Sequence, residues 1–283
     1  MSNDPKAHRL GRRFFLGEAE TLEKLGHHDQ IPRLLAYFEA QASFYLVEEM
    51  IEGRVLKDEL AARQPMPQPY VLDIIKGLLP IIAFVHSQGV IHRDIKPSNI
   101  IRRKSDGRLV LIDFGAVKLI SNKLADTDVN LTSTSTIGVG TQGYMPSEQS
   151  AGLPKFCSDL YAIGITAIEA LTGVPAYALK RDSRGEVLWR HEVPEIDPEF
   201  AKIVAKLVLY DFTERYQSAW EVLQDLEGVE PRLREQRQAL GRLIPTTPKP
   251  DPDSIDPKEA TEPTQMLSPD WFSETKNEDD PNP

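Results

Sequence analysis

Four polar residues near the middle of the chain have the types and the spacing that phosphoryl transfer requires. Residues 91–100 read Ile-His-Arg-Asp-Ile-Lys-Pro-Ser-Asn-Ile, and Asp113-Phe114-Gly115 follows shortly after. Phosphoryl transfer from ATP depends mostly on positioning and charge neutralisation, so its site needs a proton acceptor, metal ligands and a cation near the phosphate. A polar loop between two apolar runs is the alternative interpretation, but the order and completeness of the set favour chemistry.

Each of the four residues has its own expected role. Asp94 can orient a substrate hydroxyl and accept its proton, and Lys96 can neutralise charge on the moving phosphoryl group. Asn99 and Asp113 offer an amide oxygen and a carboxylate, which are hard oxygen ligands of the kind that Mg²⁺ prefers. We therefore expect ATP and Mg²⁺ as cofactors. Asn99 and Asp113 are the expected metal ligands, and Lys96, Asn99 and Asp113 are expected at the nucleotide.

These residues give the chain a resemblance to the eukaryotic-like serine/threonine protein kinases, over about residues 14–228. The stretch Lys96-Pro97-Ser98-Asn99 resembles the Ser/Thr branch of that family rather than the Tyr branch. Residues 26–32 and 44–53 are similar to bacterial members, particularly cyanobacterial ones. The resemblance implies an α+β, bilobal fold with a β-rich small lobe, here truncated, and a mainly helical large lobe.

Further motifs extend the resemblance toward the C-terminus. Residues 140–148 resemble the end of an activation segment that contains Thr141, although only the final Glu148 of the usual Ala-Pro-Glu is retained. Asp159 lies in a segment that resembles the start of the large buried helix, and the family implies that it braces the backbone of the catalytic loop. Arg215 matches the family arginine that pairs with the glutamate, which predicts a Glu148–Arg215 ion pair.

The expected activation segment spans residues 116–140 and contains a run of hydroxyl residues. This run is a candidate for autophosphorylation, and a flexible loop without that role is the alternative. Arg93, directly before Asp94, is where kinases of this type receive the loop phosphate, and phosphate–arginine pairs are strong charge-assisted bonds. The candidate phosphorylation sites are Thr132, Ser133, Thr134, Ser135 and Thr136.

Residues 44–50 are predicted to form a strand that leads into a linker. By resemblance this segment is the hinge, and Glu49 and Ile51 would offer backbone groups to adenine. Glu48 would guard the back of the adenine pocket, where a charged residue is unusual. A solvated strand residue is the alternative interpretation of Glu48.

Two parts of a kinase small lobe are absent from the sequence before the catalytic loop, namely a Gly-rich loop and a strand lysine for the phosphates. Residues 14–22 resemble the helix whose glutamate, here Glu18, pairs with that lysine. Lys6 is the only lysine upstream, and it lies in a turn-like stretch. Glu18 is therefore expected to have no partner in this chain. Either Met1 is internal to a longer kinase, or the chain is a degraded relative; the retained site residues argue for the first.

Periodicity and capping residues predict the elements that must hold the site. An Asp-Gly turn joins the predicted strands 100–103 and 108–112, and this hairpin would bring Asn99 and Asp113 together. His86 lies on the apolar side of a predicted helix and is interpreted as a packed core residue. The predicted helices cover residues 18–25, 68–88 (interrupted or kinked at Pro80) and 159–171 (with Ser158 as its cap), and two more begin after Asp197 and Ser218.

Composition divides the chain into three predicted parts. Residues 1–53 form a partial small lobe with a helix, two strands and the hinge, and residues 54–228 form the large lobe. Residues 229–283 are predicted to be a disordered, proline-rich, acidic tail, because they hold few apolar residues and 10 of the chain's 22 prolines.

Bulk properties limit the partners. The net charge of −10 argues against a nucleic-acid binder. The longest apolar stretch, 71–85, is interrupted by Asp73 and Lys76, so no membrane segment is expected, and the predicted location is the cytoplasm. Cys157 is the only cysteine, which excludes an internal disulfide, and the oligomeric state stays open.

Three classes of function compete. The leading hypothesis is a protein kinase that acts on Ser/Thr hydroxyls of a protein substrate, with part of its ATP lobe missing from this sequence. The second is a non-catalytic, kinase-like binding or regulatory module. The third is a small-molecule kinase of similar fold, which the Gly-Thr-x-Gly-Tyr element at residues 140–144 disfavours because that element suits a peptide substrate.

Overall fold

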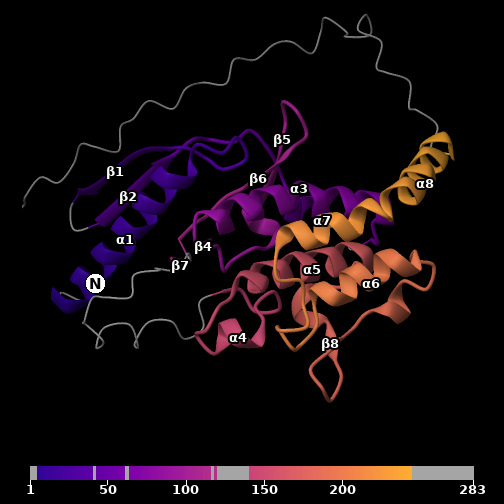
Figure 1. Cartoon of the computed structure of the whole chain (residues 1–283). Helices are drawn as coiled ribbons and strands as arrows, with labels where there is room; N and C mark the ends of the chain where they lie inside the picture. Colours follow the sequence, from indigo (N-terminus) through magenta and orange to yellow (C-terminus); the bar gives the residue numbers. More distant parts are fainter. Residues whose placement is uncertain (1–4, 41–42, 61–63, 116–117, 120–139, 244–283) are drawn as a thin grey trace, which may run out of the picture. The chain divides into compact units, whose positions relative to one another are not determined.

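The α+β class predicted from the sequence is confirmed by the alternation of helices and small sheets (Figure 1). The computed structural model describes residues 5–40, 43–60, 64–115, 118–119 and 140–243. The helices are α1 (Pro5–Leu25), α2 (Leu56–Leu60), α3 (Gln68–Ser87), α4 (Ser147–Ser150), α5 (Phe156–Thr172), α6 (Pro198–Leu207), α7 (Ala219–Glu227) and α8 (Glu230–Leu243), with short 3-10 helices η1 (Pro97–Asn99), η2 (Ala176–Ala178) and η3 (Arg190–Glu192). The strands are β1 (Leu34–Ala40), β2 (Ser43–Glu48), β3 (Gly53–Val55), β4 (Val90–Ile91), β5 (Ile100–Arg103), β6 (Leu109–Leu111), β7 (Lys118–Leu119), β8 (Lys180–Arg181) and β9 (Val187–Leu188).

Helix α1 is longer than the sequence predicted. Its buried side chains Phe15, Ala19, Leu22 and Leu25 recur at helical spacing, so one stripe of the helix faces the interior. The prediction began the helix at Glu18 and left Lys6 in a turn, and this was wrong, because the backbone is helical from Pro5. Proline tolerates the first helical turn, where its missing N–H would have no partner anyway.

The first two strands form an antiparallel pair against α1. Phe15 of α1 stacks on Phe44 of β2, with ring centroids 5.0 Å apart, and meets Tyr37 of β1 edge-on. On the opposite face, Phe38 and Tyr45 are directly paired across the strands and stack on each other, and both remain about half exposed. Within the described residues, this two-stranded sheet therefore presents an aromatic face to solvent.

The predicted hairpin between residues 100 and 112 is confirmed. Strands β5 and β6 pair antiparallel with Ile100 opposite Leu111, and β3 adds to the other side of β5. Gly107 in the turn has a φ of +72°, a left-handed conformation that glycine adopts without steric cost. The hairpin carries the chain from Asn99 out and back to Asp113.

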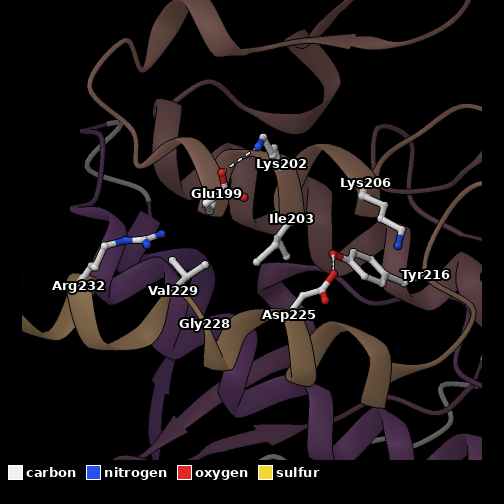
Figure 2. Close-up of a pocket in the computed structure, with 9 residues that line it drawn as sticks. All are labelled: Glu199, Lys202, Ile203, Lys206, Tyr216, Asp225, Gly228, Val229 and Arg232. Carbon is white, nitrogen blue, oxygen red and sulfur yellow. Dashed lines mark hydrogen bonds and ion pairs between the residues drawn. The ribbon is translucent and has the colours of Figure 1, made fainter.

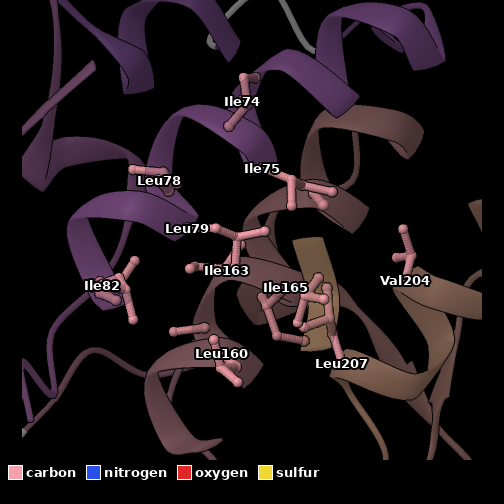
Figure 3. Close-up of a cluster of buried hydrophobic side chains, with 14 of the residues drawn as sticks. Ile74, Ile75, Leu78, Leu79, Ile82, Leu160, Ile163, Ile165, Val204 and Leu207 are labelled. Atoms are coloured by element: carbon pink, nitrogen blue, oxygen red, sulfur yellow. The ribbon is translucent and has the colours of Figure 1, made fainter. Parts of the chain in front are cut away.

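The core of the helical part is built on α3, α5 and α6. Leu79 and Ile82 of α3 lie next to Leu160 and Ile163 of α5, and α6 covers α5 from the other side (Figure 3). Each of these side chains is essentially inaccessible to water, which is worth about 1.5–3 kcal/mol per side chain. This packing makes α5 a rigid base for the catalytic loop, which follows directly after α3 and β4.

Helix α3 is long and apolar enough to pass a length-and-hydropathy test for a membrane span. The same residues are explained by the core, because one complete side of α3 is buried against the protein. Pro80 lies inside α3 without interrupting it, so the predicted restart at this position was wrong. The buried residues of α3 are Pro69, Val71, Leu72, Ile74, Ile75, Leu78, Leu79, Ile81, Ile82 and Val85.

Most helix ends agree with their capping residues. Asp197 accepts N–H hydrogen bonds from Glu199 and Phe200 at the start of α6, and Gly173 ends α5 in a left-handed conformation. Ser158 was predicted to precede and cap α5, but α5 begins earlier, at Phe156, so Ser158 lies within its first turn. There its hydroxyl accepts the N–H of the N-cap residue Lys155 at 3.0 Å, as in a capping box, and donates to a buried carboxylate at 2.8 Å.

The prediction of a disordered tail from residue 229 was wrong for its first part. Residues Glu230–Leu243 form α8, in which Leu233 is fully buried next to Val229 in the main core. Lys76 of α3 pairs with Glu230 at 2.5 Å. The prolines that suggested disorder lie mostly beyond α8, and residues 244–283, which include Trp271 and Phe272, fall outside the described part.

Candidate active site

The catalytic loop holds a triangle of three polar side chains. Lys96 Nζ donates to Asp94 Oδ2 at 2.6 Å and to Thr141 Oγ1 at 2.7 Å, and Thr141 Oγ1 donates to Asp94 Oδ1 at 2.8 Å. Asp94 and Lys96 are close in sequence, but Thr141 arrives from the segment before α4. The loop and this later segment are therefore joined at the carboxylate itself.

Asp94 is charged in this arrangement. Burial is the largest influence on it and disfavours ionisation, but hydrogen bonds from Lys96 and Thr141 and the charge of Lys96 outweigh burial and lower the pKa of Asp94. The carboxylate is thus an anion at neutral pH, able to accept a hydrogen bond from an incoming hydroxyl.

The hairpin brings Asn99 and Asp113 into contact, as the sequence predicted. Asn99 Nδ2 lies 3.4 Å from Asp113 Oδ2 and donates to the backbone oxygen of Asp94 at 3.0 Å. Asp113 itself has a φ of +66°, a conformation that is uncommon for a residue other than glycine. Phe114 after it is fully buried, and its ring meets His92 edge-on at 4.7 Å, so the two motifs pack together.

A buried carboxylate on α5 fixes the catalytic loop from behind. Asp159 accepts the backbone N–H of His92 at 2.9 Å and that of Arg93 at 2.9 Å, one on each oxygen. His86 of α3 adds a third contact at 2.8 Å. Sequence reasoning gave His86 only a packing role, because nothing local in the sequence connects α3 to Asp159.

A model of the protein kinase domain matches residues 2–226, which is most of the chain. The chain belongs to the protein kinase family. Over 219 residues it is 45% identical to serine/threonine-protein kinase C of Synechocystis sp., a match that covers 77% of this chain and 41% of the relative. Serine/threonine-protein kinase PknA of Nostoc sp. is 42% identical over 229 residues, covering 80% of this chain and 40% of the relative.

More distant relatives include serine/threonine-protein kinase PknB of Mycolicibacterium smegmatis, which is 30% identical over 244 residues, or 80% of this chain and 36% of the relative. The chain spans about two fifths of the length of the curated Synechocystis and Nostoc relatives. The likeness to bacterial serine/threonine kinases, cyanobacterial ones included, agrees with the resemblance found in the sequence.

The ion pair predicted at the end of the kinase activation segment is present. Arg215 Nη1 lies 2.7 Å from Glu148 Oε1 and Nη2 lies 3.2 Å from Oε2, with both side chains almost completely buried. Ser158 donates to the same carboxylate, and the Arg215 guanidinium lies 4.6 Å from the centre of the Tyr161 ring. A bidentate pair of this kind fixes α4 to the helical core.

Arg93 is the most conspicuous unpaired group of the site. Its side chain is buried to all but 8% of its surface, and its Nε and Nη2 atoms have no hydrogen-bond partner among the described residues. The backbone holds it at a φ of +73°, and burial, which outweighs the nearby charge of Asp159, lowers its pKa. The predicted phosphorylation sites, residues 132–136, lie outside the described residues, as does most of the activation segment.

The predicted hinge is only partly free to bind a nucleotide. The Glu49 N–H donates to the Arg33 carbonyl at 2.8 Å, so of the Glu49 backbone only the carbonyl is open to adenine. The Glu49 side chain pairs with Arg33 at 3.0 Å, which lowers the pKa of Glu49. Ile51 lies in the irregular stretch between β2 and β3.

Three carboxylates gather where a cation would be expected. Burial, followed by the charge of Asp113 and then that of Glu48, raises the pKa of Glu18. Burial and then the charge of Asp113 raise the pKa of Glu48. Among residues whose side chains are described, no lysine or arginine bonds to Glu18 or Glu48. The residues therefore fit Mg²⁺, because Asp113 and the Asn99 amide offer hard oxygens in a region of excess negative charge. The described residues contain no group of three or more His, Cys, Asp or Glu side chains that could hold a metal ion by themselves.

Two cavities differ in their relation to this site. A cavity of about 450 Å³ lies directly beside it, bounded by Lys96, Thr141, Tyr144 and Tyr177. A cleft of about 370 Å³ lies between α6 and α7, away from this site. Its charged side chains are already paired with one another, because Lys202 bonds to Glu199 and Tyr216 donates to Asp225 (Figure 2). The first cavity adjoins Lys96 and Thr141, two of the residues that bond to the Asp94 carboxylate.

The carboxylate cluster makes a pH-dependent prediction for Glu48→Gln. A raised pKa means that ionised Glu48 weakens the fold above its folded-state pKa, and that this cost vanishes below the unfolded-state pKa of about 4.3. We expect Glu48→Gln to raise the urea midpoint of unfolding at about pH 7.5 and to leave it unchanged near pH 4. The exposed Glu23→Gln is the matched control and should change neither midpoint. A stabilisation equal at both pH values would contradict the electrostatic cause.

Proposed function

We propose that this chain is the catalytic part of a serine/threonine protein kinase that transfers the γ-phosphate of ATP to a Ser or Thr hydroxyl of a protein. The observation that carries the proposal is the contact between the Asp94–Lys96–Thr141 triangle and the pair Asn99–Asp113. Asn99 Nδ2 lies 3.1 Å from Asp94 Oδ2, so the proton acceptor and the expected metal ligands share one small site. Membership of the kinase family and the serine/threonine relatives support the same activity.

In this mechanism Asp94 accepts a hydrogen bond from the substrate hydroxyl, directs its oxygen toward the phosphorus and takes its proton as the new bond forms. Thr141 and Lys96 keep the carboxylate in one orientation, and Lys96 offers positive charge to the transferring group. Asn99 and Asp113 would hold Mg²⁺, which neutralises charge on the phosphates when it is bound. Glu49 and Ile51 would bind adenine through their backbone groups.

The substrate side of the site supports a protein rather than a small molecule. The open cavity beside Lys96 and Thr141 runs along η1 and the residues after α5, which gives room for chain on either side of a hydroxyl. The net charge of −10 offers nothing to nucleic acid, and a cytoplasmic location is part of the proposal.

Replacing Asp94 by Asn tests the activity directly. The amide cannot accept the proton, so phosphate incorporation into a protein substrate should fall by about 10²–10⁴-fold, the range that removal of a general base covers. The measurement is transfer of labelled γ-phosphate by the natural protein, wild type and variant purified in parallel. Equal incorporation by both proteins would assign the signal to a contaminant and favour the binding-module alternative.

We also propose that phosphorylation within residues 132–136 activates the enzyme through Arg93. Two nitrogen atoms of the buried Arg93 guanidinium have no hydrogen-bond partner among the described residues, and a phosphate beside them would supply charge and acceptors at once. Arg93 directly precedes Asp94, so ordering its side chain would also fix the catalytic loop.

Phosphatase treatment should therefore lower kcat/KM of the wild-type protein, by about 10- to 100-fold if one charge-assisted pair of roughly 1.5–3 kcal/mol is lost. In a variant with Ala at all five positions 132–136, the same treatment should have no effect. Arg93→Lys should retain part of the dependence, since the charge remains while the bidentate geometry is lost. A full dependence on phosphate in Arg93→Ala would rule out this role.

We propose further that a Gly-rich loop and a phosphate lysine come from outside the described residues. Two features support this: residues Pro5–Leu25 form a helix rather than strands, and Phe38, Tyr45 and Val47 leave the outer face of the β1–β2 pair exposed. An added strand would cover apolar surface and pair the open edge of the sheet. Its lysine would relieve the repulsion among Glu18, Glu48 and Asp113.

The native N-terminus, measured by mass spectrometry of peptides from source cells, tests this completion. In-frame peptides from upstream of Met1 would support the proposal, because Glu18 and Glu48 bond to no lysine or arginine among the residues whose side chains are described. A terminus at Met1 or Ser2 would contradict the proposal and make the non-catalytic binding module the better assignment.

A further inference from the structure

A third cavity, of about 320 Å³, is lined by Gln142 and Gly143 of the segment that carries Thr141. Its walls combine hydrogen-bond donors and aromatic rings, and the described residues that line it include no Asp or Glu. Tyr177, which also lines the cavity beside Lys96, is 71% exposed and lies at both. The residues that give the cavity its character are Gln142, Ser147, Ser150, Tyr161, Arg181 and Arg215.

Arg181 is the cation of this cavity that has no carboxylate partner among the described residues. Its Nη1 donates to the Gly185 carbonyl at 3.0 Å, and its Nη2 donates to the Tyr161 hydroxyl at 2.5 Å. Burial, the largest influence, raises the pKa of Tyr161, so the phenol stays neutral and leaves the charge of Arg181 uncompensated. Arg215, the other cation, is already paired with Glu148.

The carboxylates closest in sequence to Arg181 are directed elsewhere. Asp182 accepts the backbone N–H groups of Arg184 and Glu186, at 2.8 and 2.9 Å, within the turn. Glu186 accepts the backbone N–H of Tyr210 at 3.1 Å on each of its oxygens. The positive charge of Arg181 is therefore left for an external anion.

The hairpin that carries Arg181 is held firmly in place. Gly185 has a φ of +87°, and a Cβ at that position would come within 2.5 Å of the Tyr210 ring. The turn can therefore lie flat on Tyr210 only with glycine there, and the two Glu186 bonds tie it to the same residue. Arg181 also lies 5.9 Å from the centre of the Tyr161 ring, which restricts its guanidinium further. A preorganised cation loses little conformational entropy when it binds.

The position of the cavity relative to Asp94 points to the substrate as its occupant. Gln142 and Gly143 line the cavity and directly follow Thr141, whose hydroxyl bonds to Asp94. An extended chain advances about 3.3–3.6 Å per residue, so a side chain within about three residues of the phosphoacceptor can reach the cavity.

We propose that this cavity is a specificity subsite that takes an anionic side chain of the protein substrate, with Arg181 as the recognising residue. The proposal rests on the protein kinase activity proposed above. Arginine presents a planar fork of donors that fits a carboxylate or a phosphate, and the Ser147, Ser150 and Gln142 side chains add neutral groups around it. An acidic residue and a phosphorylated residue share this chemistry, and the experiment separates them.

The test uses the natural full-length protein and a set of peptides that differ at one position. Each peptide carries one Ser, with Asp, Asn, Lys or phosphoserine placed in turn at each nearby position on either side. The variants are Arg181→Glu and, as the matched control, Lys180→Glu, which makes the same charge change on the same exposed hairpin but does not line the cavity. Arg181→Lys reports what the charge alone contributes.

At one peptide position we expect Asp or phosphoserine to give a KM about tenfold lower than Asn, as one charge-assisted hydrogen bond would. Arg181→Glu should abolish that preference or reverse it in favour of Lys, with kcat changed little, and Lys180→Glu should keep it. A lower KM with phosphoserine but not with Asp would assign the site to substrates that are already phosphorylated. An equally lowered KM with both would assign it to acidic substrates.

A second readout does not depend on catalysis. The same peptides with Ala in place of Ser are titrated by fluorescence anisotropy, and the Asp peptide should bind about tenfold more weakly to Arg181→Glu than to wild type or Lys180→Glu. If the wild-type protein shows no kinase activity but this binding pattern is observed, the proposed function is overturned and the anion-binding subsite stands. Equal binding of Asp and Asn peptides to wild type, or of the Asp peptide to all variants, would overturn the subsite.

Discussion

The site depends on two hydrogen bonds that Asp159 accepts from the backbone N–H groups of His92 and Arg93. A single carboxylate on the most deeply buried helix fixes two successive residues of the catalytic loop, one of them with a positive φ. Burial is the largest influence on Asp159 and favours its neutral form, but the bond to His86 and the surrounding donors lower its pKa and keep it charged. The ionised group accepts both backbone N–H groups and lies 2.8 Å from His86 Nε2.

The same construction recurs at the second buried carboxylate. Glu148 ties the end of the activation segment to Arg215 and Ser158, so both polar segments of the site are attached to α5 or to the loop between α6 and α7. Pairs as deeply buried as this one contribute little net stability, because desolvation offsets much of the attraction. Their effect here is geometric, since each carboxylate accepts only from particular donors. The apolar packing of α3 against α5 supplies the stability of the fold, and the polar contacts fix the positions of the site segments.

Sequence reasoning succeeded where the signal is local. The β5–β6 hairpin, the caps Asp197 and Gly173, and the type of each main helix followed from residues within a few positions of one another. It missed contacts with distant partners: the Ser158 hydroxyl accepts the Lys155 N–H at the start of α5 and also donates to Glu148. Residues 230–243 were assigned to a disordered tail because average composition concealed the buried positions of α8. The kinase motifs identified Asp94, Lys96, Asn99 and Asp113, but the contacts of His86 and Arg181 needed three-dimensional information.

Charge is distributed unevenly over the two sides of Asp94. On the side of α1 and β2, Glu18, Glu48 and Asp113 repel one another, and the described residues bring no cation to them. On the side of the β8–β9 hairpin, Arg181 is a cation without a carboxylate. Glu18 and Glu48 are partly buried, so the repulsion among the carboxylates opposes folding, whereas Arg181 is exposed and water solvates its charge. Under the proposals above, each imbalance is relieved by a ligand of opposite sign, namely Mg²⁺ or a lysine on one side and an anionic side chain on the other, and such a ligand stabilises the folded state that binds it.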